Sequence, residues 1–153
     1  MNQLNYIDLY AGTSALSEGF KRCGMSPVAH IEADAEACLT IKTRVAYHYL
    51  RESGKFSIYV RYLEGKIDRE TLYAHLPQRE ADSVINARIS ERSINEICDL
   101  LKKKLDVLPN KEVDLIVGGP PCQAYSVRSR HGIDLRNDER LRHYLQYGKF
   151  LKK

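Results

Sequence analysis

The stretch whose residue types are best suited to catalysis is 118–123, where two glycines and two prolines precede Cys122 and Gln123. Glycines allow a backbone to approach a ligand closely, and prolines fix φ, so the thiol is expected on a stiff loop. A thiolate presented in this way suits nucleophilic attack. Free cysteines are also often buried and inert, so Cys122 taken alone leaves both interpretations open.

An apolar run at 113–117 leads directly into this loop and is typical of a short buried strand that ends at the glycines. In open α/β sheets, crevices that bind ligands form outside the carboxyl ends of the strands. The sequence therefore predicts that Cys122 lies at a ligand-binding edge of a sheet.

A second stretch of this kind lies near the amino terminus, where the β-favouring run 4–10 ends at the small-residue turn 11–14. A helix is expected next, with Thr13 or Ser14 as its amino cap and Gly24 as its stop. Four residues stand at helical spacing within it: Leu16, Gly19, Phe20 and Cys23. Such a turn can direct backbone N–H groups at an anionic ligand group, here a carboxylate; an ordinary turn with no ligand is the alternative.

Glu32 ends the next predicted strand, 26–32, about 20 residues after the turn. An acid at this position can accept hydrogen bonds from ribose hydroxyls, as in nucleotide-binding βαβ units. A solvated strand end is the simpler explanation of Glu32 on its own. Asp34 is then expected to cap a helix that runs from 35 to about 50 and stops at Ser53 and Gly54.

The pattern is weaker from Lys55 to about Asp82, which indicates an insertion between regular elements. Residues 56–63 suit either a strand or a helical turn, and 68–75 suits a short helix. The side chains of Tyr59, Arg61 and Tyr62 either meet a nucleic acid or, as the more common case, cover the flank of the core.

Regular alternation returns with a short strand at 83–87 and an amphipathic helix that begins at Ser90. The apolar stripe of this helix comprises Ile94, Ile97, Cys98, Leu101 and Leu105. A final helical pattern spans 139–153. Four alternations of strand and helix predict an α/β fold, with a mostly parallel sheet and helices on both faces.

Composition narrows the class of protein without choosing a function. A chain of 153 residues with 43% hydrophobic and 29% charged residues suits one globular domain, and its net charge of +4 is compatible with a nucleic-acid partner. The four cysteines are scattered, so no metal site is expected. No stretch has the roughly 20 apolar residues that cross a bilayer, and the first residues lack the features of a signal peptide, so a cytoplasmic protein is expected.

Three motifs together resemble the amino-terminal part of the catalytic domain of DNA (cytosine-5-)-methyltransferases. They are Asp8-Leu9-Tyr10-Ala11-Gly12, Ile31-Glu32-Ala33-Asp34 and Gly118-Gly119-Pro120-Pro121-Cys122-Gln123-Ala124-Tyr125-Ser126. The resemblance covers Ile7 to about Leu145 and is most specific in the cysteine motif. It implies a Rossmann-like, S-adenosylmethionine-dependent methyltransferase fold, here incomplete, in which 1–153 forms the amino-terminal part of the cofactor-binding domain and carries an insertion at about 55–82.

The chemistry that the resemblance implies is methyl transfer from S-adenosylmethionine to carbon 5 of cytosine at a specific site in double-stranded DNA. Cys122 would form a covalent adduct with a cytosine flipped out of the duplex. The implied cofactor-binding residues are Asp8, Tyr10, Ala11, Gly12, Thr13, Ser14, Ala15, Leu16, Glu32, Ala33 and Pro121. The residues implied to face the DNA are Gln123, Ser126, Arg128 and Arg130. The resemblance also implies a restriction-modification system with a cognate restriction endonuclease as a partner.

The sequence departs from the family pattern at several places. Ser14 and Ala15 stand where glycines are usual, and Arg88 stands where an acid that contacts the adenine amino group is expected. No Glu-Asn-Val motif and no target-recognition region follow before Lys153. The chain is therefore expected to be an inactive fragment of the enzyme, and its uncovered apolar surface is expected to favour self-association.

Three other interpretations remain open at this level. A tRNA cytosine-5 methyltransferase shares the cysteine loop. A cofactor-binding subunit would need a partner chain that supplies the missing motifs. A generic nucleotide-binding α/β module would bind a dinucleotide instead of a methyl donor.

Overall fold

A four-stranded parallel sheet forms the centre of the molecule. The computed structural model describes residues 3–109, 111–120 and 143–152. The strands are β1 (Asn5–Leu9), β2 (Ser26–Glu32), β3 (Val84–Asn86) and β4 (Leu115–Gly118), in the spatial order β3-β2-β1-β4. Every pair of neighbouring strands is parallel, so all four carboxyl ends lie at one edge. The predicted parallel α/β arrangement is confirmed.

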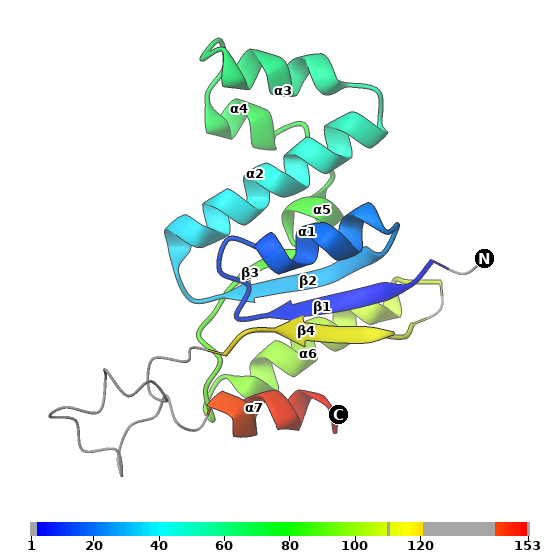
Figure 1. Cartoon of the computed structure of the whole chain (residues 1–153). Coiled ribbons are helices and arrows are strands. Elements are labelled where there is room, and N and C mark those ends of the chain that lie inside the picture. The colour runs from blue at the N-terminus through cyan, green and yellow to red at the C-terminus, as the bar shows by residue number, and fades with distance from the viewer. Residues whose placement is uncertain (1–2, 110, 121–142, 153) are drawn as a thin grey trace, which may run out of the picture.

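Helices cover both faces of this sheet (Figure 1). The helices are α1 (Ala15–Arg22), α2 (Ala35–Glu52), α3 (Phe56–Leu63), α4 (Arg69–Tyr73), α5 (Gln78–Ala81), α6 (Ile94–Asp106) and α7 (His143–Phe150). Figure 1 shows α1 and α2 on one face, and α6 and α7 on the other. The connections from β1 to β2 and from β2 to β3 carry helices, as parallel strands require.

The face beneath α6 holds the main apolar core. Ile7 and Leu9 of β1 pack there with Ile31 of β2, and all three side chains are almost completely buried. Helix α6 buries the predicted stripe from Ile94 to Leu101, and Leu105 is partly buried. The helix begins at Ile94, not at Ser90, because residues 90–93 form a hydrogen-bonded turn in which the Ser90 N–H donates to Ser93 Oγ at 3.0 Å.

Helix α1 confirms the predicted helix, but its inward face is different from the expected one. Leu16 is 56% exposed, and Cys23 is also exposed, whereas Ser14 and Ser17 are buried. The reason lies in the sheet beneath, where Asp8 is buried and offers a carboxylate to both serine hydroxyls. Satisfying that carboxylate outweighs burying a leucine side chain in this position.

The predicted insertion at about 55–82 is helical in the structure. Residues 56–63, which suited a strand or a helix, form α3, and Asp68 caps α4 by accepting from the Thr71 N–H at 2.8 Å. Tyr59 and Tyr62 pack against the small core of Ala46, Leu50 and Leu72. This placement agrees with the interpretation that these tyrosines cover the flank of the core.

Helix α7 lies against the face that α6 also covers (Figure 1). It lies within the predicted range 139–153, of which 139–142 fall outside the described residues. Its inward residues are Gln146 and Phe150, while Tyr144 and Leu145 are exposed. Phe150 joins the main core. Among the described residues, no helix is long and apolar enough to cross a membrane.

Candidate functional site

A cavity of about 290 Å³ lies at the edge of the sheet where the strands end. It is lined by Tyr10, Gly12, Ile31, Glu32, Ala33, Ala87, Arg88, Ile89, Gly119 and His143. Apart from His143 of α7, these residues end or follow four different strands, because parallel strands bring their carboxyl ends to a common edge. The cavity therefore joins the amino-terminal turn, Glu32 and the glycines before Cys122.

The turn after β1 has an unusual backbone. Tyr10, Gly12 and Ser14 have φ values of 55°, 55° and 61°, all in the left-handed region. A residue other than glycine typically pays about 1–3 kcal/mol for such a conformation, so the surroundings must hold it. The Ala11 N–H donates to Ile31 O at 3.1 Å, and the Ser14 N–H donates to Ala11 O at 2.7 Å. The turn is thereby fixed to the end of β2.

Glu32 organises the edge of the cavity through backbone donors. One of its carboxylate oxygens accepts from the Gly12 N–H at 2.7 Å, and the other accepts from the Ala33 and Asp34 N–H groups at 2.8 Å each. A carboxylate has about four lone-pair sites, so three such bonds still leave capacity for a hydroxyl donor. Glu32 therefore both ties the two turns together and remains able to accept from a ligand.

Asn86 is a structural residue of this edge that the sequence analysis did not single out. Its side-chain amide donates to Glu32 O and Ala33 O at 3.1 Å each, and it also contacts Cys38 Sγ at 3.4 Å. The Ala87 N–H donates to Glu32 O at 2.8 Å. An asparagine at the end of a strand was the available signal, but its partners are about 50 residues away and the sequence does not reveal them.

Tyr10 meets helix α7 across the cavity. Its hydroxyl donates to His143 O at 3.3 Å and lies 3.4 Å from His143 Nδ1, while the two rings meet edge to face with centroids 5.3 Å apart. Burial raises the pKa of the Tyr10 phenol to about 12. The phenol is therefore neutral at physiological pH and offers the cavity an aromatic wall.

Arg88 lies on the wall of the cavity, with its side chain exposed. Its backbone carbonyl accepts from Ser93 Oγ at 2.6 Å, which fixes the loop between β3 and α6. Among the described residues that line the cavity, Glu32 is the acidic one. That Arg88 stands where the family has an adenine-contacting acid stays a prediction.

Gly118 marks a close approach between two central strands. β4 pairs with β1 so that Gly118 lies opposite Leu9. A Cβ added at Gly118 would collide with the backbone carbonyl of Leu9, which no rotamer change can relieve. The first glycine of the cysteine motif is thus required by packing between strands, whereas a Cβ at Gly119 would meet no atom within 4 Å.

A buried polar cluster lies beneath the amino end of α1. It consists of Asp8, Ser14, Ser17 and His30, each with side chains shielded from solvent. Asp8 Oδ2 accepts from Ser14 Oγ at 3.3 Å and from Ser17 Oγ, and it lies 3.3 Å from His30 Nδ1. Ser14 Oγ lies 3.1 Å from the same His30 nitrogen. The cluster links β1, β2 and the start of α1.

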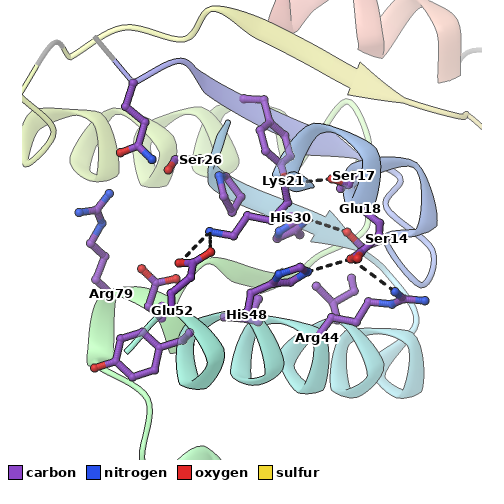
Figure 2. A pocket seen from close by; sticks show the side chains of 17 residues that line it. Ser14, Ser17, Glu18, Lys21, Ser26, His30, Arg44, His48, Glu52 and Arg79 are labelled. Atoms are coloured by element: carbon purple, nitrogen blue, oxygen red, sulfur yellow. Dashed lines mark hydrogen bonds and ion pairs between the residues drawn. The ribbon is translucent and has the colours of Figure 1, made fainter. Parts of the chain in front are cut away.

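A second cavity, of about 240 Å³, lies between α1 and α2 and reaches this cluster. Figure 2 shows charged side chains from both helices pointing into it. Glu18 Oε2 lies 2.9 Å from His48 Nε2 and 3.7 Å from Arg44, and Lys21 pairs with Glu52 at 2.9 Å. Burial alone would raise the pKa of Glu18, but hydrogen bonds from His48 and Arg22 outweigh it and lower that pKa. Because these charged side chains of α1 and α2 pair with one another, their role is to hold the two helices together.

The structure brings some of the predicted cofactor residues together and places others elsewhere. Tyr10, Gly12, Glu32 and Ala33 line the cavity at the strand ends. Asp8 and Ser14 lie in the buried cluster, and Leu16 points outward. Ala11, Thr13 and Ala15 belong to the turn and the first position of α1. The remaining predicted residues lie outside the described part of the chain: Pro121, Cys122, Gln123, Ser126, Arg128 and Arg130.

Metal chemistry has no candidate centre in the described ranges 3–109, 111–120 and 143–152. No group of three or more histidine, cysteine, aspartate or glutamate side chains is placed there to hold a metal ion. Of the cysteines in these ranges, Cys23 is exposed, while Cys38 and Cys98 are buried. Burial raises the pKa of the Cys38 thiol, so this cysteine is a poor nucleophile.

Comparison with protein families gives one match. The model of the family described as C-5 cytosine-specific DNA methylase matches residues 66–145, slightly more than half of the chain. The matched range begins between α3 and α4 and includes β3, α6, β4 and the cysteine motif. No solved structure matches the chain.

The curated relatives that match the chain are also methyltransferases. The type II methyltransferase M.Bpa9945I of Bacillus paralicheniformis is 33% identical, over 88% of this chain and 34% of its own length. The putative type II methyltransferase M.MjaORF1200P of Methanocaldococcus jannaschii is 29% identical, over 94% of this chain and 43% of its own. The type II methyltransferase M1.HphI of Haemophilus parahaemolyticus is 23% identical, over 97% of this chain and 29% of its own length. The chain thus spans less than half of each of these relatives.

Proposed function

Because the chain belongs to the C-5 cytosine-specific DNA methylase family, we propose that it supplies the cofactor-binding half and the nucleophile of an enzyme that methylates cytosine at carbon 5 in duplex DNA. Its parallel sheet with helices on both faces has the Rossmann-like architecture of S-adenosylmethionine-dependent enzymes. The methyl donor of the family is S-adenosylmethionine. The curated relatives from Bacillus and Haemophilus are both named type II methyltransferases.

The observation that carries this proposal is the composition of the cavity at the strand ends. Its lining includes Glu32, Gly119 of the cysteine motif, and Tyr10 and Gly12 of the left-handed turn. The chemistry of these groups fits a nucleoside: a carboxylate for ribose hydroxyls and an aromatic ring for a base. The amino end of α1, into which the turn leads, suits the carboxylate of an attached amino acid.

The individual roles proposed here are those that the family resemblance implies, and the arrangement of the cavity is compatible with them. Glu32 accepts hydrogen bonds from the ribose hydroxyls, and Tyr10 packs against the adenine. The backbone of the turn and of the first position of α1 approaches the methionine end of the cofactor, through Ala11, Gly12, Thr13, Ser14, Ala15 and Leu16. Ala33 borders the ribose side of the cavity. Asp8 is fully buried beneath α1, so its contribution passes through the turn and not through contact with the cofactor.

Cys122 is the proposed nucleophile. Its thiolate adds to carbon 6 of the target cytosine, which makes carbon 5 nucleophilic. S-adenosylmethionine, when bound, supplies the electrophilic methyl group that carbon 5 takes up. Loss of the carbon-5 proton to a base then re-forms the double bond and expels the thiolate from carbon 6. Pro121 borders the reacting cytosine and the cofactor.

Recognition of DNA falls to residues that follow the cysteine. Gln123, Ser126, Arg128 and Arg130 face the DNA in this proposal, where arginines suit phosphate contacts. The target cytosine leaves the base stack to reach Cys122, since its carbon 6 is not accessible within a duplex. As the relatives are type II methyltransferases, a restriction endonuclease with the same recognition site is the proposed partner in the cell.

Methyl transfer to DNA tests the proposal directly. The protein expressed from its complete native reading frame is incubated with labelled S-adenosylmethionine and duplex DNA, and label in 5-methylcytosine is measured. Cys122→Ser should abolish incorporation, at least 10³-fold, because a hydroxyl is a much weaker nucleophile than a thiolate. Cys23→Ser, at an exposed cysteine on the far end of α1, is the matched control and should retain activity.

Two further arms separate the competing interpretations. DNA that contains 5-fluorocytosine should trap a denaturation-resistant adduct with the native protein and none with Cys122→Ser, because fluorine cannot leave as the proton does. Incorporation into tRNA in place of duplex DNA would overturn the choice of substrate. Residues 1–153 alone should show no incorporation, because the chain spans only about a third of its Bacillus relative; activity of these residues would contradict this.

A further inference from the structure

We propose that His30 is a positioning residue for the cofactor site, and that it acts by holding Ser14 in its left-handed conformation. In this position the Ser14 hydroxyl is withdrawn from the amino end of α1, so the first turn of the helix keeps its N–H groups for the anionic end of the cofactor. The inference rests on the proposed function, because it specifies how the turn of that same site is maintained.

Ser14 has a conformation that its own residue type does not favour. Its φ and ψ are 61° and 31°, a region that glycine adopts readily and serine does not. Its backbone N–H donates to Ala11 O, and its side chain lies 3.1 Å from His30 Nδ1 and 3.3 Å from Asp8 Oδ2. The side-chain contacts are therefore what compensates the strain at this position.

Two helix caps of the molecule, those of α2 and α4, make a side-chain bond that Ser14 does not make. Asp34 caps α2 by accepting from the Ala37 N–H at 2.8 Å, and Asp68 caps α4 in the same way. Serine is an equally good cap residue, yet Ser14 makes no side-chain cap bond to α1. Its hydroxyl is directed down into the sheet instead. The first turn of α1 consequently has no side-chain cap from Ser14.

His30 is well placed to hold this arrangement. It lies on β2, is 3% exposed, and its ring meets that of Tyr6 edge to face at 6.0 Å. The carboxylate of Asp8 lies within 3.3 Å of the same nitrogen that meets Ser14. Asp8 also accepts from Ser17, so the ring is held between two groups that fix its position.

A coupling experiment tests this role. The dissociation constant of S-adenosylhomocysteine is measured by calorimetry for the protein from its complete native reading frame, with and without His30→Leu, in the native background and in the Ser14→Gly background. His30→Leu should weaken binding about tenfold in the native background, or about 1.4 kcal/mol. It should change binding less than twofold when Ser14→Gly is present, because glycine needs no side-chain anchor to hold a positive φ.

A conservative variant and a matched control make the result specific. His30→Asn places an amide near the position of Nδ1 and should restore most of the affinity lost in His30→Leu. Ser17→Ala removes a different partner of the same buried carboxylate and should lower the midpoint of thermal unfolding without the tenfold loss of affinity. If both His30 variants lower the unfolding temperature, their affinities measured well below that temperature still distinguish the two roles.

The outcomes are distinct. An equal loss of affinity from His30→Leu in both backgrounds would show a general structural role and overturn the inference, as would no loss in either background. If the native protein does not bind S-adenosylhomocysteine at all, the proposed function itself fails. A loss confined to the native background supports the positioning role.

Discussion

The two faces of the sheet are built from different chemistry, although the same two central strands form both. Beneath α6, the side chains of Ile7, Leu9 and Ile31 form an apolar core. Beneath α1, the alternate residues of these strands are Asp8 and His30, which form a buried hydrogen-bonded cluster. Because side chains of a strand alternate between faces, one short segment supplies both environments.

The difference corresponds to what each face must do. Apolar packing is non-directional and adds stability in proportion to the area buried. A hydrogen-bonded cluster fixes directions and distances, and leaving it incomplete is costly. The α6 face therefore stabilises the sheet, while the α1 face determines where the amino end of α1 and the turn at 10–14 lie. Two substitutions, one on each face, and one change of pH can test this contrast between the apolar and the polar face.

The largest effect is expected on the apolar face. Ile97→Ala removes a side chain of the first turn of α6 that is 2% exposed, and it should lower the free energy of unfolding by about 3 kcal/mol through lost burial and a residual cavity. Chemical denaturation measures the loss. Leu100→Ala on the same helix is the control, because Leu100 is largely exposed and should lose less than about 1 kcal/mol. Equal losses would contradict the position of this core.

An intermediate effect is expected on the polar face. Ser17→Ala leaves the Asp8 carboxylate with one donor fewer, and it should cost about 1–2 kcal/mol of unfolding free energy. Denaturation under the same conditions gives the comparison with Ile97→Ala. Ser57→Ala, at an exposed serine of α3, is the control and should be close to neutral. A Ser17→Ala variant as stable as the native protein would show that the cluster does not depend on this hydroxyl.

The smallest effect concerns the pH response at the cavity. Burial raises the pKa of Tyr10 to about 12, so the folded state favours the neutral phenol, while the unfolded chain ionises near pH 10. The stability from this shift is fully present below pH 10 and is lost as the pH rises to 12. Because Tyr10 is only partly buried, the loss should be at most about 1 kcal/mol. Unfolding free energies of the native protein and Tyr10→Phe, compared at pH 8 and pH 11, should converge at the higher pH; a constant gap would contradict the shift.

Local signals predicted much of the fold. The alternation of apolar runs and glycine-bounded turns gave the strands, and the apolar spacing of 94–105 gave the buried stripe of α6. Asp34 was predicted as a cap because the partner of its side chain lies only three residues away. For 56–63 the local pattern was compatible with two structures, and packing of Tyr59 and Tyr62 against α2 accompanies the helical one.

The cavity was predictable in part. Tyr10, Gly12 and Glu32 stand at the ends of predicted strands, and parallel strands must bring such ends together. Asn86 and His143 were not predicted as members of the site, because their partners are far away in the sequence. The Asp8–His30 contact joins residues 22 apart and depends on the register of β1 with β2.

The sequence by itself determined the order of strands and helices, the caps formed within one turn, and the cysteine motif at a strand end, because these depend on residues close together in the chain. The tertiary structure decided which way α1 faces. Its spacing favoured Leu16 as an inward residue, but the buried carboxylate of Asp8 draws Ser14 and Ser17 inward. An unsatisfied charge in the interior costs more than an exposed leucine, and only the folded sheet places that charge beneath the helix.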